Sequence, residues 1–399
     1  MLGCRTVWFG VKRDIKSLTL EELQAQLVAW GEPPYRAKQA MEWLYDRRAT
    51  SWAAMSNLPA KLRAHLDEQF GLITLKLIKL QGARDTTQKF LWRLHDSALI
   101  ESVLIPANPS LYGEASDRHT LCVSTQVGCA YGCKFCASGL DGWKRNLGAE
   151  EIVEQVLGVE RWHEAQPAQP APLTDPSAES PPSGGAATPR DSLRLVNNLV
   201  IMGMGEPLAN YENLMLALRI LNAPWGVGIG ARKITVSTSG LVPQIRRLAE
   251  EPMQLRLAVS LHGATDHVRA QIMPVNRKYP LAQLVSACEF YQAKKGRMIT
   301  LEYILIAGIN DGLDQTEPLA VLARRLHAKV NLIPYNPVEG LPWERPDEAA
   351  QEAFLAALEA RDVTATLRRE KGTEIDAACG QLRLRTEREM EAGVAATSS

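Results

Sequence analysis

The feature that most constrains the fold of this 399-residue chain is a regular alternation of strand-like and helix-like segments beyond residue 118. Short runs rich in β-branched residues recur, and a helical stretch follows each of them. Strands separated by helices at this spacing predict a parallel α/β sheet, either open or closed into a barrel. In such sheets, functional groups gather where strands end and loops begin. The predicted strands are TLCVSTQV, LVNNLVIMGM, KITVSTS, LRLAVSLH, ITLEYILI, KVNLIPYN and VTATLRR.

Two different patterns precede this region. From Thr19 to about Phe70 the apolar spacing is helical, and Thr19 with Glu22 forms a candidate capping box. Between residues 73 and 105 the period shortens, which predicts three short antiparallel strands. The predicted organisation is therefore a helical domain at 1–72, an antiparallel β connector at 73–114, an α/β core at 115–363 and a C-terminal segment at 364–399.

One segment interrupts the alternation. Residues 164–191 are rich in Pro, Ala, Ser and Gly, with almost no large apolar side chain to bury. Such a composition cannot offset the entropy lost on ordering, so we expect a disordered surface insertion between a helix and the second strand. A partner-binding tail is the alternative.

Charge and cysteine usage narrow the class of protein. Lys plus Arg (45) equals Asp plus Glu (45), so RNA binding has to be argued from local features. No stretch is apolar enough for a signal peptide or a membrane span, which predicts a soluble cytoplasmic protein. Four of the seven cysteines fall between Cys122 and Cys136, unlike a secreted disulfide framework. Clustered cysteines indicate metal or redox chemistry.

The cysteines form a specific motif. Cys129, Cys133 and Cys136 have the spacing CxxxCxxC in a loop after a predicted strand, and three thiolates suit an iron-sulfur cluster. Three ligands for four irons leave one iron open to a small molecule. The alternative is a structural zinc site with Cys122 as its fourth ligand, because structural zinc prefers a closed tetrahedral set.

Polar groups close the next strands. The sequence MGMGEP at 202–207 can bring backbone groups and Glu206 against a ligand ammonium. Ser237, residues 260–262 and Asn336 offer hydroxyl, imidazole and amide groups suited to a ribose or a carboxylate. The candidate cofactor-binding residues are Gly205, Glu206, Ser237, Ser260, Leu261, His262 and Asn336.

Three motifs together carry a family resemblance. TLCVSTQVGCAYGCKFC at 120–136, MGMGEP at 202–207 and IDAACGQ at 375–381 resemble the RlmN/Cfr family of radical SAM RNA adenine methyltransferases. The resemblance extends over nearly the whole chain, and AACGQ is its most discriminating part. It implies a radical SAM partial (β/α) barrel with a helical N-terminal domain and a short antiparallel β segment. It also implies a 4Fe-4S cluster on the three motif cysteines and S-adenosylmethionine (SAM), two molecules per turnover.

The resemblance also assigns catalytic roles. One SAM would methylate Cys379, and a second would supply the radical that activates this methyl group for addition to adenine. Cys122 would form a disulfide with Cys379 as the protein-RNA adduct breaks down, and Glu101 matches the family's proton acceptor. Without the resemblance, both cysteines would be interpreted as inert buried thiols and Glu101 as a solvated carboxylate.

The implied substrate is C2 of an adenosine in 23S rRNA, with a tRNA adenosine beside the anticodon as a second target. The implied partners also include an electron donor such as flavodoxin or ferredoxin, and the implied state is a monomer without membrane contact. C8 methylation of the same rRNA adenosine is one alternative. A non-catalytic zinc-containing RNA-binding protein is another. Candidate phosphate contacts are Arg36, Lys38, Arg47, Arg48, Lys61, Arg63, Arg368, Arg369, Lys371, Arg383 and Arg385.

Overall fold

The computed structural model describes residues 12–82, 87–107, 118–166, 194–368 and 380–397. Nearly all of the predicted insertion at 164–191 lies outside these ranges, so its disorder stays a prediction. Cys4 and Cys379 also lie outside the described residues.

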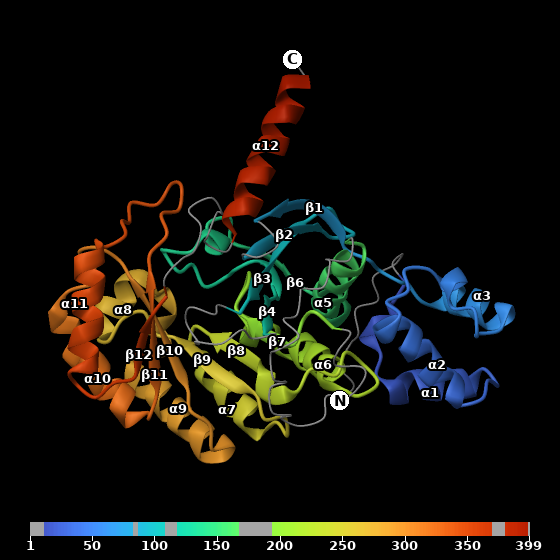
Figure 1. Cartoon of the computed structure of the whole chain (residues 1–399), viewed down its shortest axis with the longest axis horizontal. Coiled ribbons are helices and arrows are strands. Elements are labelled where there is room, and N and C mark those ends of the chain that lie inside the picture. Colours follow the sequence, from blue (N-terminus) through green and yellow to red (C-terminus); the bar gives the residue numbers. More distant parts are fainter. Residues whose placement is uncertain (1–11, 83–86, 108–117, 167–193, 369–379, 398–399) are drawn as a thin grey trace, which may run out of the picture.

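The N-terminal module is helical, as predicted. It contains α1 (Leu20–Ala29), α2 (Tyr35–Met41) and α3 (Ala60–Gln69), and it lies at one end of the molecule (Figure 1). The predicted capping box is present: the Glu22 amide donates to Thr19 Oγ1 at 3.2 Å, and the Thr19 amide donates to Glu22 Oε2 at 2.9 Å. The sequence signal therefore sets the start of α1.

Buried ion pairs attach this module to α5 (Ala149–Glu164) of the core. Lys16 Nζ lies 3.2 Å from Glu154 Oε2, and Arg48 Nη2 lies 3.4 Å from Glu160 Oε2. The Arg48 side chain is 7% exposed. Arg48 is therefore an anchor of the module, and the prediction that it contacts phosphate at the surface is wrong.

One curved sheet organises the rest of the described chain. Its first four strands pair antiparallel, and the following strands pair parallel to β4. The predicted antiparallel connector thus continues the core sheet directly. In sheet order the strands are β1 (Lys76–Gln81), β2 (Gln88–Arg93), β3 (Leu99–Pro106), β4 (His119–Cys122), β7 (Asn198–Ile201), β8 (Ile234–Thr238), β9 (Arg256–Ser260), β10 (Thr300–Leu305), β11 (Lys329–Pro334) and β12 (Ala365–Leu367).

The first predicted strand of the α/β region is divided. After β4, the chain leaves the main sheet and forms β5 (Gln126–Gly128), which pairs antiparallel with β6 (Trp143–Asn146). This hairpin carries the cysteine motif between its two strands.

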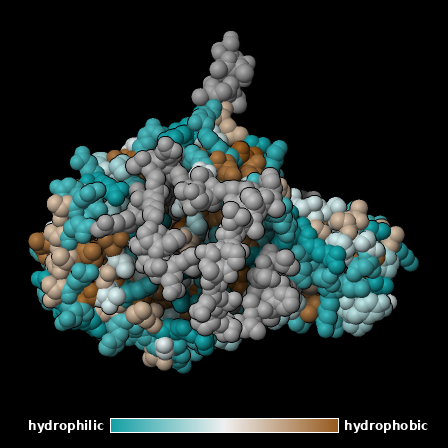
Figure 2. Space-filling model, in the orientation of Figure 1, coloured by the Kyte–Doolittle hydropathy of each residue, from teal (hydrophilic) through white to brown (hydrophobic). Residues whose placement is uncertain are grey.

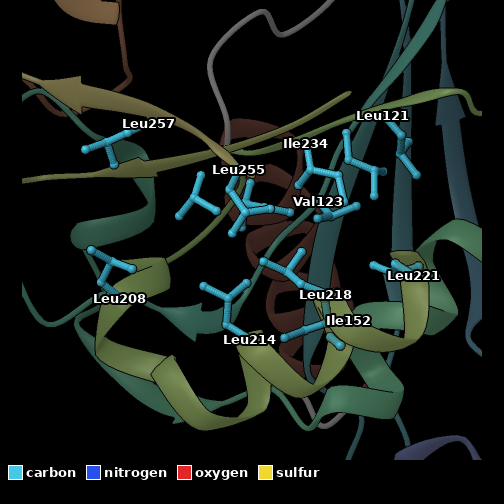
Figure 3. Close-up of a cluster of buried hydrophobic side chains, with 14 of the residues drawn as sticks. Leu121, Val123, Ile152, Leu208, Leu214, Leu218, Leu221, Ile234, Leu255 and Leu257 are labelled. Atoms are coloured by element: carbon cyan, nitrogen blue, oxygen red, sulfur yellow. The ribbon is translucent and has the colours of Figure 1, made fainter. Parts of the chain in front are cut away.

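Helices cover the outer face of the sheet. They include α5, α6 (Tyr211–Asn222), α7 (Val242–Glu250), α8 (Asp266–Ile272), α9 (Leu281–Lys295), α10 (Thr316–Arg325) and α11 (Glu348–Glu359). Leu121 and Ile234 of the sheet meet Leu214 and Leu218 of α6 in a buried hydrophobic layer (Figure 3). Burial of these side chains stabilises the layer by roughly 1.5–3 kcal/mol each.

The last helix, α12 (Gln381–Thr397), stands apart from the other helices. It rises from the sheet near β1 and β2 and extends away from the body (Figure 1). A small hydrophobic area adjoins its base on the face shown in Figure 2. No helix within the described residues is long and apolar enough to cross a membrane.

Candidate active site

The inner face of the sheet collects several predicted site residues. Cys122 pairs in register with Val103 and Val200, and because side chains alternate along a strand, Glu101 shares the face of Val103. Ser237 pairs with Ala258, and Ser260 lies two residues further along that strand. Val200 in turn pairs with Thr235, two residues before Ser237, so Glu101, Cys122, Ser237 and Ser260 share one face.

Sequence reasoning missed two further residues of this face. Glu302 is directly paired with Ser260 on one side and Asn331 on the other. Asn331 Nδ2 donates to Glu302 Oε2 at 2.7 Å, and burial raises the pKa of Glu302. The available signal was a carboxylate in the middle of the apolar run ITLEYILI, since an acidic residue is rarely buried without a partner.

The cysteine loop is held by the β5–β6 hairpin. The Cys129 amide donates to the Gly142 carbonyl at 3.0 Å, and the Cys136 amide donates to the Cys133 carbonyl at 3.1 Å. Gly128 has φ +74°, and a Cβ there would lie 2.0 Å from the Gly142 oxygen. Only glycine fits this close approach and this left-handed backbone conformation.

The three thiols fit an iron-sulfur cluster. Burial raises the pKa of Cys129 to about 12 and that of Cys133 well above its usual range, and the thiolate of Cys136 raises both further. The thiols are therefore close enough to repel one another as thiolates, and bound iron would compensate their charge. Among the described residues, including Cys122, no three His, Cys, Asp or Glu side chains gather as ligands of a single ion.

Both oxygens of the Glu206 carboxylate accept hydrogen bonds from backbone amides of the protein. It is 4% exposed, Oε1 accepts from the Leu208 amide at 3.1 Å and Oε2 accepts from the Ser239 amide at 2.7 Å. Burial raises its pKa. Glu206 thus ties the end of β7 to the end of β8, and Gly205 beside it has φ +98°.

Arg269 is a buried cation that the sequence did not reveal. It is fully buried, and its guanidinium donates to the Leu261 carbonyl at 3.1 Å, to Asn276 Oδ1 at 2.8 Å and to the Ser239 carbonyl at 2.5 Å. Burial lowers its pKa to about 10, so it stays charged at neutral pH. One side chain therefore joins the loops after β8 and β9 to the segment after α8.

His262 is neutral in this environment. Burial, and then the charge of Arg269, lower the pKa of His262 to about 3. Its Nδ1 accepts from the Ile304 amide at 3.0 Å, and its ring meets the edge of the Phe135 ring at a centroid distance of 4.8 Å. His262 also has φ +52°, a left-handed conformation that is uncommon outside glycine. It joins the cysteine loop to β10.

The cysteines outside the motif differ in their surroundings. Cys122 is 6% exposed at the end of β4, on the inner face. Cys288 on α9 is 1% exposed, and burial raises its pKa to about 12, as expected of an inert thiol. Cys379 is outside the described residues, but Gly380, to which it is bonded, is described.

The start of α12 lies against Glu101. Glu101 is 2% exposed, and its carboxylate accepts from the amides of Gly380 and Arg383. On another side, Gln381 Nε2 donates to the Pro337 carbonyl at 2.6 Å, directly after the partly exposed Asn336. The first turn of α12 thus joins the site. Arg383 is fully buried, so the prediction that it contacts phosphate is wrong.

Comparisons with known proteins agree with this geometry. Residues 13–72 match the model of the ribosomal RNA large subunit methyltransferase N-terminal domain, and residues 193–316 match that of the radical SAM superfamily. A probable dual-specificity RNA methyltransferase RlmN 3 from Opitutus terrae is 53% identical over 96% of this chain and 98% of its own. A probable dual-specificity RNA methyltransferase RlmN from Akkermansia muciniphila is 49% identical over 94% of this chain and 96% of its own.

A solved structure completes the comparison. The radical SAM methyltransferase from Sphaerobacter thermophilus is 43% identical, with a TM-score of 0.79, over 92% of this chain and 98% of its own. The predicted radical SAM fold with a helical N-terminal region is confirmed. The chain belongs to the RlmN family of radical SAM methyltransferases.

Proposed function

We propose that this enzyme methylates C2 of an adenosine in 23S rRNA and of an adenosine beside the tRNA anticodon. The names of the relatives, which describe dual-specificity RNA methyltransferases, support two RNA substrates. One observation carries the chemistry: Gly380, bonded to Cys379, lies against Glu101 on the face that also holds Cys122. This contact supports a shared site for Glu101, Cys122 and the residue bonded to Gly380.

Cys129, Cys133 and Cys136 would hold the 4Fe-4S cluster. Together with SAM, this cluster supplies the radical chemistry that an unreactive methyl group and the electron-poor C2 of adenine require. Glu206 and backbone groups of residues 202–207, including Gly205, would bind the SAM ammonium, and the amides of Leu208 and Ser239 hold the Glu206 carboxylate in place. Ser237, Ser260, Leu261, His262 and Asn336 would hold the rest of SAM.

The methyl group passes through Cys379. Its sulfur forms a bond to the methyl carbon of one SAM as the sulfonium bond breaks, and a second SAM is used to remove a hydrogen atom from that methyl. The resulting methylene carbon bonds to C2 of adenine, one electron of this radical adduct returns to the electron carrier, and Glu101 accepts the proton lost from C2. The thiolate of Cys122 then bonds to the sulfur of Cys379 as the bond between that sulfur and the methylene carbon breaks, and this carbon takes up a proton to complete the methyl group. Two electrons from the electron donor reduce the disulfide for the next turnover. Two SAM molecules are used per turnover.

RNA would be held by exposed basic side chains. Lys38, Arg47 and Lys61 of the N-terminal module are exposed, as is Arg385 of α12. These cations suit a phosphate backbone and carry no sequence information themselves. The enzyme would act as a cytoplasmic monomer, with flavodoxin or ferredoxin as its electron donor.

The regiochemistry is tested by the product. Anaerobic reaction with SAM, a reductant and either 23S rRNA or tRNA should yield 2-methyladenosine in both digested RNAs, identified by mass spectrometry. Formation of 8-methyladenosine would contradict C2 chemistry, and methylation of one RNA alone would contradict the dual substrate.

A further inference from the structure

Both oxygens of Glu101 are engaged by the first turn of α12. The Gly380 amide donates to Oε2 at 2.9 Å and the Arg383 amide donates to Oε1 at 2.7 Å. These amides belong to the start of a helix, where backbone N–H groups lack partners within the helix. A carboxylate at this position is also favoured by the helix dipole. Glu101 therefore caps α12 from a strand far away in the sequence.

A buried cation faces the same carboxylate. Lys89 Nζ lies 3.5 Å from Glu101 Oε2, and the two side chains are 1% and 2% exposed. Leu91, which pairs in register with Glu101, forms a small buried cluster with Leu99 and Leu382 of α12. This cluster is separate from the main core. Leu384 of α12 packs in the main core, so the contact combines one ion pair, two hydrogen bonds and two buried leucines of α12.

The same helical turn contacts the cysteine loop. Arg383 Nη2 lies 2.9 Å from Asp141 Oδ2. Gly380 has φ +88°, and a Cβ there would lie 2.9 Å from Ser138 Oγ. Ser138 and Asp141 directly follow the cysteine motif. Docking of this turn therefore fixes Gly380 between β3 and the segment that would hold the cluster.

We propose that the Lys89–Glu101 ion pair is a latch that docks the first turn of α12, and that methylation of Cys379 requires this docking. The proposal rests on the function proposed above. Gly380, whose amide donates to Glu101, is bonded to Cys379, so the docked turn directly follows the residue to be methylated. Lys89 is a positioning residue, since it acts through Glu101. Proton acceptance by Glu101 then requires the turn to move away.

Substitution of Lys89 tests the latch. Lys89→Met removes the cation, keeps much of its length and leaves a buried carboxylate unpaired, which is strongly destabilising. The matched control is Lys79→Met, because Lys79 also pairs with α12, at 3.8 Å from Glu389, but is 39% exposed. Hydrogen exchange of residues 380–390 measures docking in the iron-loaded protein, and mass spectrometry measures S-methylcysteine at position 379.

In Lys89→Met we expect exchange in this segment to rise at least about tenfold, and S-methylcysteine to fall by a similar factor. Iron content and reductive SAM cleavage should stay within about twofold of wild type, a split that general destabilisation would not produce. Lys79→Met should match wild type. Unchanged exchange and methylation in Lys89→Met would overturn the latch.

A second pair of variants isolates one hydrogen bond and remains informative if Lys89→Met does not fold. Arg383→Pro and Arg383→Ala both lose the guanidinium, but only proline loses the amide that donates to Glu101. Proline is tolerated in the first helical turn. We expect faster exchange and less methylated Cys379 in Arg383→Pro, and equal behaviour of the pair would overturn the latch. Absence of S-methylcysteine in wild type would instead contradict the proposed function, while the exchange data would still test docking.

Discussion

The site contains two groups of buried charged residues, and they differ in how far apart their hydrogen-bond partners lie in the sequence. In the cofactor region, formed by Glu206, Arg269 and the loops after β7, β8 and β9, the partners of the Glu206 carboxylate and of the Arg269 guanidinium are 2 to 33 residues away. In the helix-docking region, formed by Lys89, Glu101 and the first turn of α12, Glu101 and its helical partners are 279 and 282 residues apart. The side-chain contacts of the first region form within one segment, although the Glu206 amide also donates to Gln126, 80 residues away, whereas the second region needs two distant parts of the chain in place.

This difference has a dynamic consequence. The loops of the cofactor region contribute Leu208, Leu241 and Leu261 to the main hydrophobic core. In the helix-docking region, Leu382 of α12 forms a small separate cluster with Leu91 and Leu99, and Leu384 is the one residue of the described part of α12 in the main core. Segments with few buried apolar contacts open at lower free-energy cost than the core. We therefore expect substitutions in the cofactor region to affect global stability, and those in the helix-docking region to affect docking of α12.

The largest effect is expected for the cluster ligands. Cys133→Ala removes one of three thiolates and should abolish iron binding and SAM cleavage, because three ligands leave no spare thiolate in the motif. Docking of α12 should persist, since Lys89 and Glu101 are unchanged. Iron analysis, deoxyadenosine formation and hydrogen exchange check these expectations. Full iron content with undiminished SAM cleavage in Cys133→Ala would refute the ligand assignment.

A smaller but global effect is expected for Arg269. Arg269→Met leaves the Ser239 and Leu261 carbonyls without their donor, so we expect the free energy of unfolding to fall by about 3 kcal/mol or more. Anaerobic chemical denaturation measures this loss. The control is Arg247→Met, because the Arg247 side chain is 52% exposed and pairs with an exposed Glu212. Equal losses in both variants would contradict a special role for Arg269.

A pH-dependent effect is expected for His262. Its pKa of about 3 in the folded chain lies below the ordinary value of 6.5, so the unfolded chain takes up a proton first as the pH falls. Stability from this group is complete above pH 6.5 and is lost progressively toward pH 3. Between pH 8 and pH 5, wild type should lose about 2 kcal/mol more than His262→Gln. Identical losses in urea unfolding of the two proteins would contradict a buried neutral imidazole.

Local patterns in the sequence predicted much of the fold. The capping box of α1 and the three antiparallel strands depend on neighbouring residues, and both are present. The predicted strand TLCVSTQV was wrong at Ser124, whose hydroxyl donates to the Glu101 carbonyl at 2.6 Å and accepts from the Met204 amide at 2.9 Å. These partners come from β3 and from the loop after β7, so the interruption has no local signature.

Sequence motifs predicted the residues of the site, but they did not predict the hydrogen bonds and ion pairs between them. Ser237 and Ser260 close successive strands, and alternation along those strands places both on one face. The role of Arg269 depends on the packing of three loops, and the pairing of Lys89 with Glu101 depends on strand register. Nothing near these residues in the sequence distinguishes them from solvated charges. Tertiary contacts decide their roles.

The direct test of the account compares the two cysteines outside the cluster. Cys379→Ala removes the methyl acceptor, so no covalent adduct with RNA can form. Cys122→Ala keeps the acceptor but lacks the thiol that resolves the adduct. After reaction with substrate RNA, SAM and a reductant, a denaturing gel should show a stable protein-RNA crosslink in Cys122→Ala alone, with clusters intact in both variants. A crosslink in Cys379→Ala, or none in Cys122→Ala, would contradict the methyl-cysteine mechanism.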